Sequence, residues 1–163
     1  MAQPVVLAER DIEYVHTQVI IQTFADRVLV IVTQLQKVGT LIQASVPSTA
    51  ALAEIASDNL TSDATSSTLP PVHPSIDLNY LFGNAPTLDH QTLYSSYAAQ
   101  IATLVWASER YGRVGPSHIP VVVGVALKSP RTFEIPSGTE SDRATFLQVM
   151  ELVRDTLGTA HAT

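Results

Sequence analysis

The sequence predicts an α+β fold, in which a mostly antiparallel sheet of about five or six strands packs with two amphipathic helices. Three observations support this prediction. The unbroken apolar run Val28–Val32 is typical of a buried strand. Several other segments alternate apolar and polar residues with a period of two, which also indicates strands. Two later segments carry their apolar residues at helical spacing.

Composition and length indicate one domain over residues 1–163, because 163 residues can bury one hydrophobic core but not two. The hydrophobic fraction of 45% favours a packed protein over a disordered one. The sequence has no cysteine, which excludes disulfides, thiolate zinc sites and cysteine nucleophiles. A signal peptide and a bilayer-spanning run are both missing. We therefore expect a cytosolic or nuclear protein that does not act at a membrane.

The net charge of −6 is concentrated in the middle of the sequence. From Val38 to Glu109 there is no Lys or Arg, whereas six residues are acidic, and the other nine acids and nine bases cancel. Such a region repels nucleic acid and attracts a basic protein surface. Nucleic acid is therefore not an expected partner.

The first half of the chain is expected to supply several strands. Residues 1–11 form a loose arm or an outer strand. The alternation over Val15–Thr23 predicts a strand with one covered face, and Phe24–Arg27 turns the chain into Val28–Val32, so that the first three strands form an antiparallel meander. Since Val28–Val32 has no polar position, we expect cover on both of its faces. Two helices on opposite faces, or one helix layer plus a partner protein, would supply it.

A five-residue link, Leu35–Gly39, joins this run to the next strand. Thr40–Val46 alternates like a half-buried strand, and Gly39 can adopt the positive φ that a tight return needs. The two strands are therefore predicted to pair directly, as a hairpin at the core of the sheet.

Residues 47–74, rich in Ser, Thr, Ala, Asp and Pro, predict a long acidic flexible loop within the domain. Two interpretations stay open: a solvated linker, or a docking arm whose apolar anchors and carboxylates fold onto a basic surface. The candidate partner-binding residues are Leu52, Glu54, Ile55, Asp58, Leu60 and Asp63 in this loop, with Lys37 and Val38 in the preceding link.

After the loop, residues 76–82 alternate as a fourth strand, and Gly83–Pro86 ends it. Thr87 is the predicted N-cap of an amphipathic helix that extends to about Arg110. Its apolar face is expected to contact the core. Ile119–Leu127 is the next β-rich run.

The last part of the chain is expected to form a loop and a helix. Residues 129–138 contain two prolines and are mainly loop, although Arg131–Ile135 could form a short edge strand. Thr139 or Ser141 is expected to cap the final helix, which Gly158 closes. Its apolar stripe consists of Phe146, Val149, Met150, Val153 and Leu157.

No known catalytic pattern is present: the phosphate-loop, dinucleotide, serine-elbow and zinc-protease motifs are all missing. The five histidines are far apart, and none has the i, i+4 spacing of a helical metal site. The sequence therefore predicts a noncatalytic protein without a metal or cofactor.

The segment Thr33–Leu41, Thr-Gln-Leu-Gln-Lys-Val-Gly-Thr-Leu, preceded by the apolar run, resembles the signature hairpin of the proteasome assembly chaperone 3 family. The resemblance covers most of the chain except the termini. Its other parts are Thr17–Val19, Phe24, Leu81–Gly83, Pro86, Ile101–Glu109, Val121–Lys128 and Leu147–Val153. The chain departs from the family pattern in residues 47–74, 111–118 and 129–138, which affects the loops that would contact partners.

The resemblance implies a noncatalytic assembly chaperone that pairs with proteasome assembly chaperone 4. Such a pair guides formation of the 20S proteasome α-ring, binding α subunits, α5 above all, until β subunits join, and it needs no nucleotide or metal. A second interpretation is a small ligand-sensing α+β domain that binds a metabolite. That function needs convergent polar groups in an apolar cavity, which the sequence does not reveal.

Overall fold

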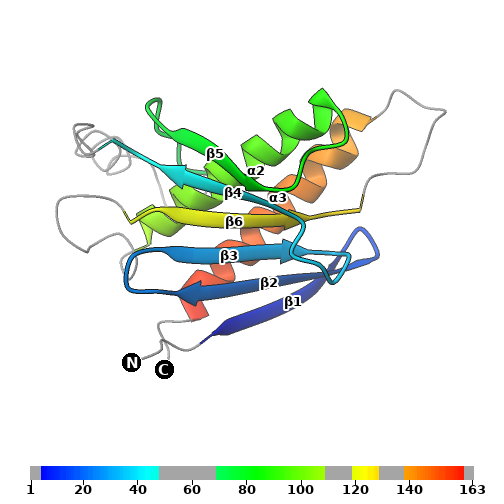
Figure 1. Cartoon of the computed structure of the whole chain (residues 1–163). Coiled ribbons are helices and arrows are strands. Elements are labelled where there is room, and N and C mark those ends of the chain that lie inside the picture. Colours follow the sequence, from blue (N-terminus) through cyan, green and yellow to red (C-terminus); the bar gives the residue numbers. More distant parts are fainter. Residues whose placement is uncertain (1–4, 48–68, 109–118, 129–137, 160–163) are drawn as a thin grey trace.

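The computed structural model describes residues 5–47, 69–108, 119–128 and 138–159. These residues form a six-stranded sheet with two helices behind one of its faces (Figure 1). The strands are β1 (Val6–Ile12), β2 (Val15–Thr23), β3 (Val28–Thr33), β4 (Thr40–Ser45), β5 (Asp77–Phe82) and β6 (Val121–Ala126), and the helices are α2 (Leu88–Ala107) and α3 (Gly138–Thr159). The predicted α+β class, with a mostly antiparallel sheet, is confirmed.

The strand order is β1-β2-β3-β6-β4-β5. All neighbours run antiparallel except β3 and β6, which are parallel. The meander predicted for the first three strands is present as β1, β2 and β3, and β1 is the outer strand anticipated for the start of the chain. Both ends of the sheet, β1 and β5, are edge strands.

The predicted hairpin between Val28–Val32 and Thr40–Val46 is wrong, because β6 lies between these two strands. The physical reason is that β6 is buried along its whole length and therefore needs a hydrogen-bonded neighbour on each side. The link from β3 to β4 crosses the end of β6 instead. Gly39 (φ +72°) lies so close to β6 that a Cβ atom there would be 2.1 Å from the carbonyl oxygen of Val125.

Both helices cover the same face of the sheet (Figure 1). Helix α2 packs on β6, β4 and β5, and α3 packs on β1 and β2 and against α2. The core lies between the two layers, and its largest fully buried side chains are Tyr97, Ile12, Ile21, Ile42, Ile101 and Met150. Of the two kinds of cover expected for Val28–Val32, the structure therefore shows one helix layer, and the opposite face of the sheet carries no helix among the described residues.

Helix α2 begins as predicted and ends earlier than predicted. The side chain of Thr87 accepts a hydrogen bond from the backbone N–H of His90, as expected of an N-cap. The helix ends at Ala107, with Ser108 as its C-cap, rather than near Arg110. Its apolar face contacts the core as predicted, since Tyr97, Ile101 and Leu104 are buried.

Helix α3 starts before the caps predicted for it, since Thr139 and Ser141 lie inside the helix, and Gly158 lies in its last turn. The predicted apolar stripe is confirmed. Val149, Met150, Val153 and Leu157 are buried, and Phe146 packs edge-on against Tyr97 with ring centroids 4.9 Å apart. The ring pair joins the two helices near the middle of each.

Some predictions concern residues that the structure does not describe. They are the edge strand Arg131–Ile135 and most of the acidic loop, residues 48–68. The last part of the predicted loop is described: Leu69 packs against the core, and the carbonyl of Pro70 accepts a hydrogen bond of 2.8 Å from the Gln100 side chain. The chain therefore returns from the loop along α2.

Candidate interaction surfaces

The face of the sheet that points away from the helices has an apolar centre. Register places Ile20 of β2 opposite Ile31 of β3, and Ile31 beside Gly124 of β6. Leu41 of β4 lies across from the same glycine. A Cβ atom on Gly124 would lie 3.3 Å from Leu41 and 3.4 Å from Ile31, so these two side chains close over the glycine from both sides. The result is a continuous apolar strip across the middle strands.

This strip, with its neighbours, is called the open sheet face below. Its apolar members are Leu7, Ile20, Leu29, Ile31, Leu41 and Val122. Leu7 is 57% exposed, and Ile20, Leu29, Ile31 and Leu41 are half-buried, although no helix in the described part of the chain covers them. Polar side chains surround the strip, among them Gln18, which donates a hydrogen bond of 3.2 Å to Glu9. An apolar centre within a polar rim is the usual composition of a protein interface.

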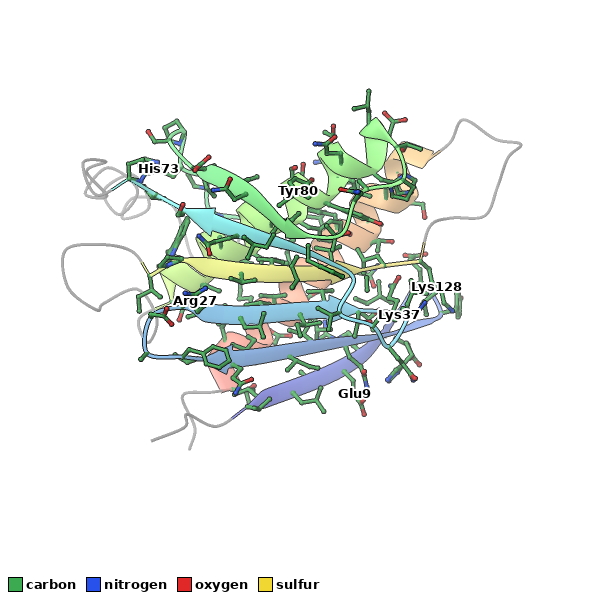
Figure 2. All side chains as sticks on the ribbon, viewed as in Figure 1. Glu9, Arg27, Lys37, His73, Tyr80 and Lys128 are labelled. Atoms are coloured by element: carbon green, nitrogen blue, oxygen red, sulfur yellow. The ribbon has the colours of Figure 1, made fainter. Side chains whose placement is uncertain are left out.

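The two candidate partner-binding residues in the β3–β4 link lie at one end of the open sheet face. Lys37 and Val38 are both exposed, Val38 at 47%. The link is held by the Thr33 hydroxyl, which accepts hydrogen bonds from the backbone N–H groups of Leu35 and Lys37. Figure 2 shows Lys37 at the same end of the sheet as Lys128. The structure thus presents this link at the surface, as a contact requires.

The other six candidates, Leu52, Glu54, Ile55, Asp58, Leu60 and Asp63, lie outside the described residues. Their role stays a prediction from the sequence.

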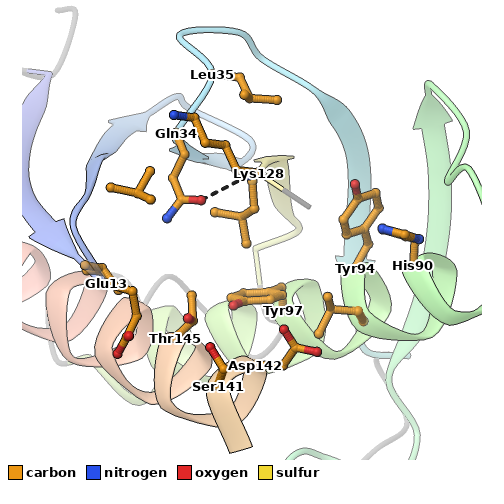
Figure 3. Close-up of a pocket in the computed structure, with 14 residues that line it drawn as sticks. Glu13, Gln34, Leu35, His90, Tyr94, Tyr97, Lys128, Ser141, Asp142 and Thr145 are labelled. Atoms are coloured by element: carbon orange, nitrogen blue, oxygen red, sulfur yellow. Dashed lines mark hydrogen bonds between the residues drawn. The ribbon is translucent and has the colours of Figure 1, made fainter. Parts of the chain in front are cut away.

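A pocket of about 710 Å³ opens at the carboxyl ends of the parallel strands β3 and β6, where both helices begin. Figure 3 shows Tyr97 and Asp142 on its helical wall, and Gln34 and Lys128 on the opposite wall. The side-chain amide of Gln34 shapes that wall. It donates a hydrogen bond of 3.0 Å to the Thr17 hydroxyl and accepts one of 3.0 Å from the Lys128 backbone N–H. Crevices at the carboxyl ends of parallel strands are frequent binding sites in open sheets.

Tyr97 is the most deeply buried polar side chain in this pocket, with 2% of its surface exposed. Burial raises the pKa of its phenol, and the negative charge of Asp142 raises that pKa further. The phenol is therefore neutral at physiological pH. Burial likewise raises the pKa of Tyr94, which also lines the pocket.

Sequence reasoning missed this pocket, because its residues come from five segments that are distant in the chain. A partial signal was available. Gln34 and Lys128 lie within two residues of the ends of two strongly apolar runs, which places polar side chains at strand ends. This signal identifies a pocket only if the two runs are parallel neighbours in the sheet, whereas the sequence pattern favoured a hairpin of β3 with β4.

The remaining polar contacts of the described residues are structural. Arg10 of β1 donates a hydrogen bond of 2.8 Å to Asp155 of α3, which connects the edge strand to the helix layer. Among these residues no group of three or more His, Cys, Asp or Glu side chains is arranged to hold a metal ion. No helix within the described ranges is long and apolar enough to cross a membrane.

Comparisons with known proteins yield a match in structure but not in sequence. No family model and no curated protein matches the sequence. The fold is similar to a chain in the crystal structure of a novel chaperone complex for yeast 20S proteasome assembly, with a TM-score of 0.54 and 12% sequence identity. The alignment covers 95% of this chain and 99% of that chain. The chain therefore has the fold of a proteasome assembly chaperone subunit, and the match does not single out the chaperone 3 type.

Proposed function

We propose that this chain is a noncatalytic proteasome assembly chaperone. In this proposal it pairs with a subunit of similar fold, proteasome assembly chaperone 4, and the pair holds 20S α subunits, especially α5, during α-ring formation until β subunits join. It acts in the cytoplasm, and its location extends to the nucleus. The resemblance of Thr33–Leu41 and the fold shared with a subunit of a yeast assembly chaperone complex support the proposal.

The single observation that carries the pairing is the open sheet face. In a two-layer protein, an apolar sheet surface without a helix on it leaves hydrophobic area in water, and covering that area provides the driving force for association. Leu29, Ile31 and Leu41 lie at its centre, and the polar residues around them can satisfy hydrogen bonds at the rim of an interface. We therefore assign the partner subunit to this face.

Charge substitution on each side of the molecule tests the assignment. Ile31→Glu introduces a carboxylate at the centre of the open sheet face, and pairing should be lost while circular dichroism stays native-like. Leu147→Glu is the matched control, since Leu147 is 44% exposed on α3, and it should pair normally. If Ile31→Glu does not fold, Leu7→Glu makes the same test at the edge of this face. Normal pairing by a folded open-face variant would refute the assignment.

The client is tested by affinity capture from a cell extract. Recovery of proteasome α subunits together with a partner of similar size supports the chaperone function. Replacing Glu54, Asp58 and Asp63 by Ser should weaken α-subunit binding and reduce its salt dependence, while pairing is retained. If the variant and the wild type bind α subunits with the same affinity across a salt series, the acidic loop is a linker and not a docking arm.

A ligand-sensing domain is the second candidate, and the pocket at the carboxyl ends of β3 and β6 favours it. Its volume lies within the range of small-molecule sites, and it combines apolar and polar lining residues. Native mass spectrometry separates the two functions. A retained metabolite, without capture of proteasome subunits, would favour the sensor.

A further inference from the structure

The pocket described above contains a tyrosine hydroxyl without a hydrogen-bond partner in the described part of the chain. Tyr97 is 2% exposed and lines the cavity, and its hydroxyl forms no hydrogen bond with any other described residue. The oxygen itself is not fully buried, because among the described residues only Ser108 Oγ is both buried and without a partner, so the Tyr97 hydroxyl opens to the cavity. The phenol therefore marks a place where a polar group from outside can bind.

A carboxylate stands beside this phenol. Asp142, in α3, lines the same wall in Figure 3, and its charge acts on Tyr97. Among the described residues Asp142 forms neither a hydrogen bond nor an ion pair. A second carboxylate, Glu13, also lines the pocket, and one of its oxygens accepts a hydrogen bond of 3.1 Å from Gln148. The other oxygen of Glu13 is left for a ligand.

The rest of the pocket is apolar or oppositely charged. Leu93, Leu127 and the ring of Tyr94 provide apolar surface. Lys128 is the one lysine or arginine among the lining residues, and it belongs to the wall opposite Asp142 (Figure 3). His90 also lines the pocket and is engaged with the Thr87 hydroxyl at 2.7 Å. An anion next to Tyr97 would face Asp142 and Glu13 directly, which excludes a negatively charged ligand from this wall.

We propose that this pocket binds an arginine side chain of a partner polypeptide. The guanidinium would lie between Asp142, Glu13 and the Tyr97 oxygen, and its methylene stem would contact Leu93 and Leu127. Arginine fits better than lysine because its planar fork can donate to a carboxylate and to a phenol oxygen at once, and because it stacks on aromatic rings. The polypeptide source rests on the proposed function, in which this chain holds another protein.

The site is separate from the open sheet face. The pocket lies at the carboxyl ends of the strands and on the helix side, where Tyr97 and Asp142 are located. A subunit paired through the open sheet face would therefore leave it accessible. This division gives one protein a surface for its pairing partner and a second surface for its client.

The test uses the full chain labelled with ¹⁵N and a blocked tripeptide, acetyl-Leu-Arg-Leu-amide. Its matched probe replaces arginine by citrulline, which has the same shape without the charge. We expect chemical-shift changes at Tyr97, Asp142 and Leu127 with the arginine peptide, and binding about tenfold weaker with the citrulline peptide. Asp142→Asn should weaken arginine-peptide binding about tenfold, and Tyr97→Phe by a smaller factor.

Glu140→Gln is the control, because it removes a charge from the first turn of α3, two residues before Asp142, at an exposed position outside the pocket. It should leave peptide affinity unchanged. Equal affinity for the two peptides, or equal losses for Asp142→Asn and Glu140→Gln, would overturn the proposal, as would the absence of pocket shifts. The proposed chaperone function is tested separately, by affinity capture. It is wrong if the wild-type protein captures no proteasome subunit, whether or not the peptide binds.

Discussion

Replacing Gly39 by alanine should destabilise the protein strongly, because two separate costs coincide at this residue. Its φ of +72° lies in the left-handed region, which costs a residue with a Cβ about 1 kcal/mol. The added Cβ would also lie 2.1 Å from the Val125 oxygen and 2.6 Å from the Val125 carbonyl carbon. These are backbone atoms of the central strand β6, so relief requires movement of the link or of the strand end.

Such movement disturbs the pairing of Thr40 with Val125, the first pair of the β4–β6 ladder. Adding the loss of one or two backbone hydrogen bonds to the left-handed cost, we expect Gly39→Ala to lower the free energy of unfolding by about 3 kcal/mol. That is a large part of the stability of a typical domain, about 5–15 kcal/mol.

Urea denaturation followed by circular dichroism measures this change, provided that the slope of the transition stays the same as in the wild type. Gly158→Ala is the matched control. A Cβ at Gly158 meets no atom within 4 Å, and the residue lies in helix α3, so alanine should stabilise by about 0.5 kcal/mol. A free energy of unfolding within about 0.5 kcal/mol of the wild-type value is typical of a substitution without a structural effect. If Gly39→Ala gives such a value, the link does not cross β6 as described.

Three further predictions concern stability. Thr87→Ala should cost about 1 kcal/mol in urea denaturation, since it removes the cap that accepts from the His90 N–H, and Thr87→Ser should restore most of it. Arg10→Met should cost less than about 1 kcal/mol, and the loss should shrink in high salt, because its bond to Asp155 is exposed to solvent. The pKa of Tyr97 is raised in the folded state, so the unfolded chain loses that proton first. Stability should therefore fall as pH rises above the ordinary tyrosine pKa of 10.0, by up to about 1.4 kcal/mol per pH unit, and Tyr97→Phe should reduce this slope in alkaline denaturation.

The strands and helices were largely predictable, because each depends on local periodicity. Val15–Thr23 was predicted to the residue, since its odd positions face the helix layer and its even positions do not. Thr87 was recognisable as a cap from its place after Pro86. The end of α2 was placed too late because the amphipathic pattern gave no stop before Gly112.

The pairing of the strands was less predictable. Two apolar runs separated by a short glycine-containing link have the pattern of a hairpin, and the insertion of β6 between them depends on a strand 75 residues or more further along the chain. Backbone hydrogen bonds do not distinguish one apolar strand from another, so the sequence of β3 is equally compatible with β4 or β6 as a neighbour. The whole-length burial of β6, which decides the matter, is a tertiary property.

By itself the sequence determined the class of fold, the extent of most elements and the residues of the helical stripes, since side chains must alternate with the geometry of strand and helix. It also determined where negative charge accumulates. Only the tertiary structure decided that both helices lie on one face, that Ile31 and Leu41 flank Gly124 on the other, and that Tyr97 shares a pocket with Asp142. These features depend on segments brought together by packing, and no local pattern records which segments will meet.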